Sequence, residues 1–454
     1  MTRSPNLVGT AGRREFLRVG SLSLLGITLD QYLRAADAQP KGGRAGRRKA
    51  EACILLWLEG GPSQMDTWDP KGNSGFKPIP TRVPGIQISE LFPRVARHMD
   101  KLSVIRSMHT EENNHPQGSH YALTGHRPVG GMKFPSLGSM ICKEAGRRND
   151  VPPYVVVPQP WEVDFFDYKD GFEAAFIGPE YSPMILPDPS KPDFHIPDLS
   201  LPKTLTSQMI DDRRAFLTAV DRLYRRRVRL AEFDKIDALQ QRALAMLGSP
   251  DVKKAFDLSQ EPSKTKDAYG RHRVGQSLLL ARRLVEAGCR FVTAAGYKHG
   301  QWDTHAQNNE NLRKELAPTL DLTLSTLLED LCQRGLLETT VVLVMGEFGR
   351  TPEVNPQGGR DHWPDCWSLL IGGGGLEGGH VIGASDAKAA YVADRMVSMG
   401  DVYATIYQAF DIDWTKTYMT PIGRPIYIAN ALGDRQGEPI KELVKGLDAP
   451  APRG

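Results

Sequence analysis

The chain has 454 residues, of which 40% are hydrophobic and 24% are charged, and its formal net charge is +3. This composition excludes the disordered, fibrous and disulfide-stapled classes and is typical of a globular protein. The net charge is too small to indicate binding to nucleic acid or to an anionic membrane. The five cysteines are scattered and lack CxxC spacing, so we expect no disulfide framework.

The N-terminal segment has the pattern of an export signal. The pair Arg13-Arg14 precedes an apolar run at 19–29 that is too short to span a bilayer, and Ala36-Asp37-Ala38 supplies a small-x-small cleavage pattern. The paired arginines resemble a twin-arginine signal, with an ordinary secretory signal or an uncleaved anchor as alternatives. We predict a signal segment at 1–38, a basic linker at 39–50 and a mature protein that is periplasmic or extracellular, without a stable membrane span.

The first predicted strand ends in candidate ligands. The apolar run from Ala52 to Leu58 is typical of a strand buried on both faces of a mainly parallel sheet. Glu59 opens a Gly-Gly-Pro turn that allows the backbone to approach a ligand closely, and Asp66 follows on the loop. Ligands in open α/β sheets bind beyond the carboxyl ends of strands, which makes both acids candidates. An N-cap or Asx-turn is the alternative explanation for Asp66.

The second predicted strand, at 102–105, leads into a histidine-rich loop. Four of the eleven histidines of the chain lie there: His109, His115, His120 and His126. This concentration after a strand favours a metal or phosphoryl-type site. The alternative is that one or two of them cap a helix near 118–123.

The remaining elements complete one predicted domain at 51–435. Residues 151–270 form a loop-rich and helical insertion that starts with a strand at 154–157. Apolar strands at 290–295, 341–345 and 367–371 then alternate with amphipathic helices, which predicts a parallel sheet covered on both faces. We expect residues 436–454 to form a polar tail.

Three clusters of ionisable residues follow strands in the C-terminal half: Asp303 with His305, Glu347 with Arg350, and Asp361 with His362. Mixed carboxylate and imidazole ligands suit zinc or manganese, whereas carboxylates alone suit calcium or magnesium. Asp361 and His362 are adjacent, so one of them is expected to orient the other. Arg350 either holds an anionic substrate oxygen or forms an ion pair with Glu347. A metal held here would polarise a phosphoryl, sulfuryl or carbonyl oxygen and activate water.

Several separate motifs carry a family resemblance: LLWLEGGPSQMDTWDPK, LTGHRP, WDTH, GEFGRTP and GRDHW. Together they resemble the secreted bacterial family catalogued as domain of unknown function 1501, over about residues 50–430. That family is grouped with the alkaline phosphatase and sulfatase superfamily. The resemblance implies a three-layer α/β/α sandwich with a mainly parallel sheet and a metal site at the strand ends.

The superfamily motifs carry over only in part. The resemblance places a metal-binding acid at Glu59 or Asp66, and it makes His362 the match for the last metal histidine. Phe348 stands where the superfamily has a histidine that binds metal. His115 falls at the position of the superfamily nucleophile, where this chain has no Cys, Ser or Thr. The resemblance therefore implies either direct attack by water or a fold that has lost catalysis.

These observations predict an exported, metal-dependent hydrolase of phosphate or sulfate esters, including esters carried by a polysaccharide. The predicted catalytic residues are His115 and Arg350, and the predicted ligands of a zinc, manganese or calcium ion are Glu59, Asp66, Asp303, His305, Glu347, Asp361 and His362. The alternative is a non-catalytic binding or scaffold protein that keeps the fold.

Overall fold

The computed structural model describes residues 49–159, 169–196, 209, 212, 245–298 and 300–447. The predicted signal segment, nearly all of the predicted linker and part of the predicted insertion at 151–270 lie outside the described residues. None of the described helices is both long and apolar enough to cross a bilayer.

An eight-stranded sheet forms the centre of the domain, in the order β12-β4-β11-β8-β1-β7-β5-β6. Its strands are β1 (Ala52–Trp57), β4 (Leu102–Met108), β5 (Tyr154–Val157), β6 (Met184–Ile185), β7 (Phe291–Ala294), β8 (Thr340–Met345), β11 (Trp367–Gly373) and β12 (Val381–Ile382). Seven strands run in one direction, and β11 runs antiparallel to its neighbours β4 and β8. The predicted mainly parallel sheet is confirmed.

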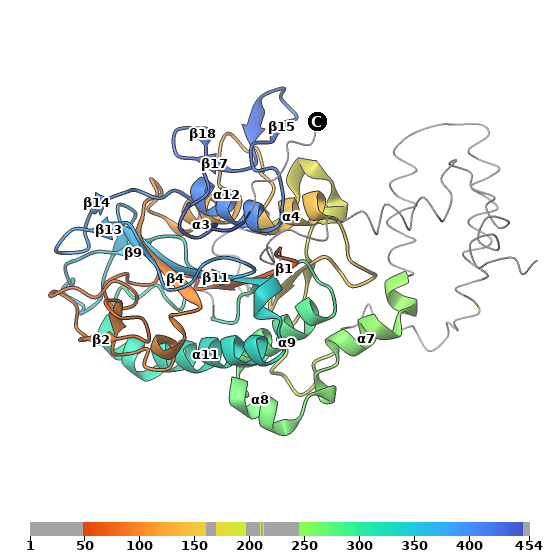
Figure 1. Cartoon of the computed structure of the whole chain (residues 1–454), viewed down its shortest axis with the longest axis horizontal. Coiled ribbons are helices and arrows are strands. Elements are labelled where there is room, and N and C mark those ends of the chain that lie inside the picture. The colour runs from red at the N-terminus through yellow and green to blue at the C-terminus, as the bar shows by residue number, and fades with distance from the viewer. Residues whose placement is uncertain are drawn as a thin grey trace, which may run out of the picture. The chain divides into compact units, whose positions relative to one another are not determined.

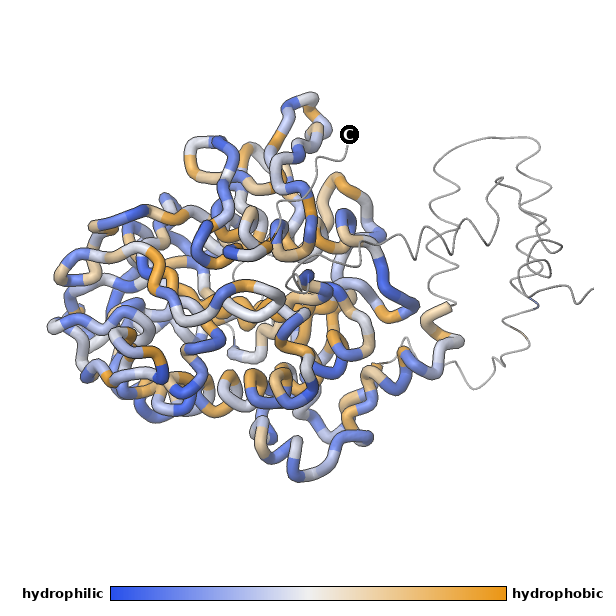
Figure 2. The backbone as a smooth tube through the Cα atoms, viewed as in Figure 1, coloured by the Kyte–Doolittle hydropathy of each residue, from blue (hydrophilic) through white to orange (hydrophobic). Residues whose placement is uncertain are grey.

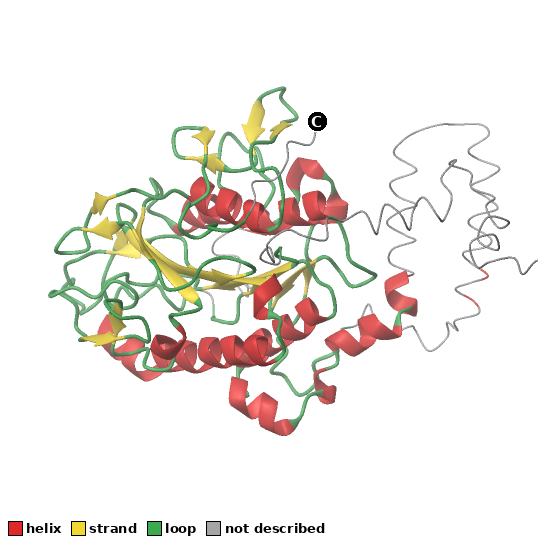
Figure 3. Cartoon of the chain, viewed as in Figure 1, coloured by secondary structure: helices red, strands yellow, loops and turns green. Residues whose placement is uncertain are grey.

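Helices cover both faces of this sheet (Figures 1 and 3). Along β1, Ile54 and Leu56 join one hydrophobic core, whereas Cys53, Leu55 and Trp57 join the other. The first core lies under α8 (Ser263–Tyr269), α9 (Arg273–Glu286) and α11 (Ala317–Gln333), and the second under α3 (His115–Thr124), α4 (Leu137–Ala145) and α12 (Met399–Ala409). This arrangement confirms the three-layer α/β/α sandwich.

Hydropathy along the backbone follows these layers. Figure 2 shows hydrophobic residues along the central strands and on parts of the covering helices, and hydrophilic residues along much of the outer loops. The strands of the sheet centre are fully buried, so their near-continuous apolar runs are what the two covered faces require.

Smaller elements decorate this frame. The remaining helices are η1 (Val95–His98), η2 (Lys169–Phe172), η3 (Ala175–Ile177), η4 (Pro179–Tyr181), α7 (Pro250–Phe256), η6 (Leu258–Gln260), α10 (Asn308–Asn311), the π-helical η7 (Leu312–Leu316) and η8 (Leu337–Thr339). The paired short strands are β2 (Pro78–Pro80) with β3 (Gln87–Ser89), β9 (Gly349–Arg350) with β10 (His362–Trp363), β13 (Ala384–Ser385) with β14 (Val392–Asp394), β15 (Thr417–Met419) with β16 (Pro425–Tyr427), and β17 (Asn430–Ala431) with β18 (Arg435–Gln436).

The domain extends further than the sequence predicts. Residues 436–447 were expected to begin a polar tail, but Ile440, Leu443 and Val444 are buried in the core that contains α12. Their spacing places three apolar side chains on one side of a short turn, which is enough to anchor this segment.

Candidate metal centre

Loops at one edge of the sheet bring most of the predicted residues together. Asp303 follows β7, Glu347 follows β8, and His115 begins α3 after β4. These three strands run in the same direction, so their carboxyl ends meet at the same edge. The antiparallel pairing of β9 with β10 sets Arg350 opposite His362, which adds both residues to the group.

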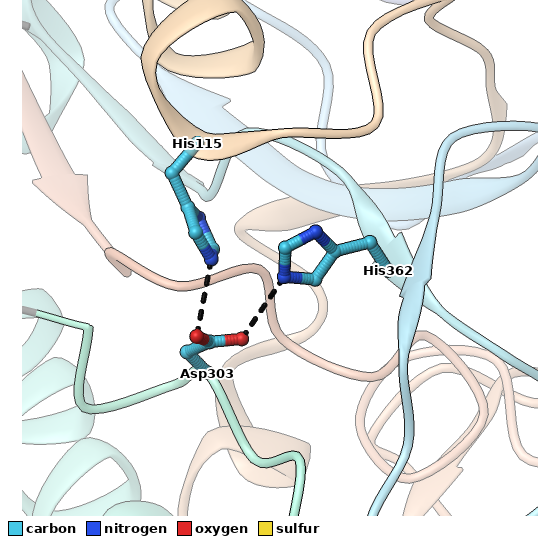
Figure 4. A group of neighbouring side chains, drawn as sticks. All are labelled: His115, Asp303 and His362. Atoms are coloured by element: carbon cyan, nitrogen blue, oxygen red, sulfur yellow. Dashed lines mark hydrogen bonds and ion pairs between the residues drawn. The ribbon is translucent and has the colours of Figure 1, made fainter. Parts of the chain in front are cut away.

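The carboxylate of Asp303 lies at the middle of the cluster. Its Oδ2 is 3.2 Å from His115 Nε2, and its Oδ1 is 3.2 Å from His362 Nε2 (Figure 4). His305 Nε2 lies 3.0 Å from the same Oδ1. Ligand atoms of His115, Asp303 and His362 lie within 4.8 Å of one another. Four ligands that each stand about 2.0–2.1 Å from a tetrahedral zinc are separated by roughly 3.3 Å, which is close to these distances.

Each of the three imidazole rings is held through its other nitrogen. His115 Nδ1 is 2.6 Å from Glu347 Oε1, and His305 Nδ1 is 2.7 Å from Asp361 Oδ1. His362 Nδ1 is 2.7 Å from the carbonyl oxygen of Asn113, which can only accept a hydrogen bond. Oxygen acceptors at all three Nδ1 atoms favour rings that carry their proton there, so that the Nε2 lone pairs face Asp303.

That arrangement calls for a cation between the rings. His305 Nε2 and His362 Nε2 are only 3.0 Å apart, and two neutral rings protonated at Nδ1 would oppose lone pairs there. A proton on one ring or a shared metal ion resolves this conflict. Carboxylate plus imidazole is a donor set that suits zinc or manganese, and the residues therefore fit such an ion.

The pKa shifts of His115 and Asp303 indicate that the cluster stabilises positive charge. Burial alone lowers the pKa of His115, but its hydrogen bonds to Asp303 and Glu347 outweigh burial and raise the pKa to about 9. Burial alone raises the pKa of Asp303, but hydrogen bonds from His115 and His362 and the charge of Arg350 hold that pKa far below its ordinary value. The site thus favours an ionised carboxylate beside a cation.

Arg350 holds the carboxylate of Asp303 in place. Its buried guanidinium donates hydrogen bonds to Asp303 and to the carbonyl oxygens of Gly60, Gly61 and Arg360. The ion-pair partner of Arg350 is therefore Asp303 and not the predicted Glu347. With most of its donors on backbone carbonyls, Arg350 joins the β1 turn to the loop that carries Asp303.

Glu59 and Glu347 hold the loops around Asp303. Glu347 is fully buried and accepts the Gly60 N–H, at 3.0 Å and 3.3 Å from its two carboxylate oxygens. Glu59 is buried, accepts the Gly300 N–H at 3.3 Å, and its carbonyl oxygen accepts the Trp302 N–H at 3.0 Å. Both acids lie beside the cluster, in positions that orient ligands.

The structure does not bring Asp66 into this group. Its fully buried carboxylate accepts hydrogen bonds from four other side chains: Ser63 (2.7 Å), Ser74 (2.7 Å), Asn308 (3.0 Å) and Arg360 (2.8 Å). Asp66 therefore fixes Arg360, whose carbonyl oxygen accepts a hydrogen bond from Arg350. Asp66 is thus linked to the centre indirectly, through Arg360 and Arg350 and through Asn308, which accepts the Thr304 hydroxyl at 2.6 Å.

Phe348 forms one wall of the centre. Its ring is fully buried, with ring centroids 5.1 Å from His115 and 4.7 Å from His362. Gly61 and Gly118 leave room for it, because a Cβ atom at either position would lie within 3 Å of the ring. An apolar wall here excludes water and leaves the histidines on the other side to share one place for a cation.

Sequence reasoning missed several contributors because they act through the backbone. The carbonyl oxygen of Asn113 and the N–H of Gly60 have no residue-type signature. Arg360 precedes the predicted pair at 361–362, and its role depends on the distant Asp66. The GRDHW motif was the only available signal for it.

Comparison with known proteins gives a family but no curated relative. The profile of a family described as a protein of unknown function (DUF1501) matches residues 50–444. No curated protein matches the chain.

Solved structures that resemble the chain include a protein in the alkaline phosphatase superfamily from Vibrio parahaemolyticus, with 13% identity and a TM-score of 0.38 over 81% of this chain and 68% of that one. PsFucS1 sulfatase from Pseudoalteromonas sp. has 12% identity and a TM-score of 0.38 over 81% and 68%. A TAB5 alkaline phosphatase mutant with bound Mg has 12% identity and a TM-score of 0.37 over 80% and 99%. These TM-scores are low, so the fold assignment rests on the strand order and layers described above.

Proposed function

The chain belongs to the DUF1501 family of proteins of unknown function, as its motifs predict, and from this premise we propose an exported, metal-dependent hydrolase of phosphate or sulfate esters, including ester groups on a polysaccharide. One observation carries the proposal: three histidines, each held at Nδ1 by an oxygen, turn Nε2 toward the single carboxylate of Asp303. Export is supported by the N-terminal sequence alone.

The chain's own residues have distinct tasks in this function. His115, Asp303 and His362 hold a zinc or manganese ion, with His305 as a further ligand from the exposed side of the cluster. The bound ion would polarise the ester oxygen and lower the pKa of a coordinated water. Glu347 fixes the ring of His115, and Arg350 fixes Asp303. Asp361 fixes the ring of the half-exposed His305 through Nδ1.

A test of this function begins with metal content. We expect natively purified protein to contain about one zinc or manganese ion per chain, measured by elemental analysis. Asp303→Asn keeps the side-chain shape but removes the central charge. It should weaken metal binding by more than about 100-fold, since changes outside the ligand set already cost 10–100-fold. The exposed Asp394→Asn is the matched control, with unchanged affinity.

Turnover of aryl phosphate and aryl sulfate esters completes the test. The metal-loaded wild type should hydrolyse one of them, and Asp303→Asn should not. Equal metal affinity in wild type and Asp303→Asn would contradict the centre itself. Tight binding without turnover of either ester would instead support the alternative, a non-catalytic binding protein. That alternative is favoured by Phe348, which occupies the wall where the resemblance places another ligand.

A further inference from the structure

A second polar feature lies beside the loop that carries Asp303. Two hollows, of about 680 Å³ and about 410 Å³, share Ser190 and Lys191 in their walls and so form one groove. One end is lined by α7, η6 and α8, and the other by Gly296, Tyr297, Lys298 and Gln301. Gln301 in this wall precedes Asp303 by two residues, so this end of the groove adjoins the Asp303 loop in sequence.

Cations dominate the walls of this groove. Six lining residues are positively charged: Lys191, Lys253, Lys266, Arg271, Arg273 and Lys298. Three are acidic: Asp188, Asp257 and Glu315. The groove therefore has three more basic than acidic residues, which equals the formal net charge of +3 of the whole chain. The small net charge of the chain gives no indication of this local concentration.

The acidic groups in the groove are already used by neighbouring polar groups. Asp188 accepts the Ser190 N–H and hydroxyl, at 2.9 Å and 2.7 Å. Asp257 accepts the Ser259 N–H and the Gln260 side chain, both at 2.9 Å. Glu315 accepts the side-chain amide of Gln301 at 2.8 Å. These carboxylates therefore shape the walls and are not paired with the lysines.

Four lysines of the groove lack an acidic partner among the described residues. Lys191, Lys253, Lys266 and Lys298 form no ion pair with any residue in the described part of the chain, whereas Arg271 pairs with Asp267. Like charges along one groove raise the local positive potential and attract a polyanion from solution. We call Lys191, Lys253, Lys266 and Lys298 the lysine groove.

The chemistry of the walls selects among polyanions. Phe256 and Tyr297 are buried, so among these lining rings the half-buried Phe194 and the exposed His195 offer the limited surface on which nucleic acid bases could stack. Hydroxyl groups of Ser190 and Ser259 lie among the cations and suit the hydroxyls of sugars. Hydroxyl partners beside positive charges match a chain of sugars that carries sulfate, phosphate or carboxylate groups.

We propose that the lysine groove binds an acidic polysaccharide and leads one of its ester groups to the centre at Asp303. The identification of this polymer as substrate rests on the proposed hydrolase function, whereas its binding to the groove does not. The groove would act on affinity for the polymer and leave the turnover of small esters unchanged.

The test compares two variants of equal charge. Lys191→Gln/Lys253→Gln/Lys298→Gln removes three charges from the groove. Lys77→Gln/Lys264→Gln/Lys441→Gln removes three exposed lysines elsewhere, including one on α8 that does not line the groove. Binding of labelled dextran sulfate and of polygalacturonate is measured against salt concentration, with neutral dextran as reference. We expect the groove variant to lose at least about tenfold in affinity at low salt and the control variant less than twofold, since exposed charges act over about a Debye length.

Further variants separate polymer binding from ester turnover. Lys191→Arg/Lys253→Arg/Lys298→Arg should keep binding, and Asp303→Asn should keep polymer binding while losing ester turnover. Failure of turnover with intact groove-dependent binding would therefore remove only the hydrolase function. Equal losses in both Gln variants, no binding by wild type, or tighter groove-dependent binding of a single-stranded oligonucleotide or polyglutamate would overturn the proposal. Thermal melting of each variant identifies any that fail to fold.

Discussion

At the scale of single residues, the centre depends on hydrogen bonds that orient rings rather than on the ligands alone. His115, His305 and His362 have three different acceptors at Nδ1: a buried carboxylate, an exposed carboxylate and a backbone carbonyl. Such partners fix tautomer and ring direction, and they raise the basicity of the ligating nitrogen when the acceptor is charged. Glu347 is the partner best protected from solvent.

Replacing Glu347 by Gln tests this orientation. Gln is close in shape but neutral, and its single carbonyl oxygen would have to accept both His115 Nδ1–H and the Gly60 N–H. We expect the affinity for zinc to fall by about 10–100-fold, as is usual when a partner of a ligating histidine is removed. Isothermal titration calorimetry measures the change, with the exposed Glu353→Gln as the control. Unchanged affinity would show that the ring of His115 is held by packing against Phe348 alone.

At the scale of elements, the turn after β1 is a tight constraint on the site. Gly60 has φ of +111°, and a Cβ atom there would lie 2.3 Å from the backbone nitrogen of Asp303. The β1 turn and the Asp303 loop can therefore meet only because Gly60 lacks a side chain. Its N–H and carbonyl are also used by Glu347 and Arg350.

Gly60→Ala is expected to push these two loops apart. The backbone conformation alone costs roughly 1–3 kcal/mol for a residue with a side chain, and the clash adds to this. We expect a lower free energy of unfolding in urea and weaker metal binding in the same variant. Gly72→Ala is the matched control, because nothing lies within 4 Å of its Cβ position and its φ is not in the left-handed region. Similar stability of the two variants would contradict the close approach.

The elements show what sequence alone could and could not establish. The sequence predicts β5 with its observed bounds, and it predicts β1, β7 and β8 to within one residue at each end. These strands could be found because a strand buried on both faces has a continuous apolar sequence. The reversed direction of β11 could not be predicted, since an apolar run has the same sequence pattern in a parallel and an antiparallel strand. The sequence also does not indicate which carboxylates lie close together in the folded protein. Asp66 and Glu59 lie on one loop, but only contacts with distant residues such as Arg360 and Gly300 distinguish them.

At the scale of the whole molecule, a buried histidine links stability to pH. His126 is buried and stacks on Phe134 with ring centroids 4.4 Å apart. Burial lowers the pKa of His126 to about 4, although the charge of Asp434 opposes the shift. The unfolded chain takes up this proton near the ordinary histidine pKa of about 6.5, and the folded chain does not. The stabilising contribution is thus complete above about pH 6.5 and is lost as pH falls toward 4.

His126→Gln removes this proton linkage. Between pH 7.5 and pH 5, the wild type should lose about 2 kcal/mol of unfolding free energy beyond any loss in the variant, at about 1.4 kcal/mol per pH unit. Urea unfolding at several pH values measures the difference between the two proteins, so other titrating groups cancel. A difference that does not depend on pH would mean that His126 is protonated equally in both states.

The reversal of β11 has a consequence for the order in which the centre can assemble. Three residues of the centre follow a strand of the sheet: His115, Asp303 and Glu347. His362 instead precedes a strand, because it lies just before β11, which runs in the opposite direction. β11 also lies between β4 and β8, so it joins the His115 loop to the Glu347 loop across more than two hundred residues of sequence. Such long-range pairing forms late during folding. The residues of the candidate centre can therefore come together only after the ribosome has released most of this domain.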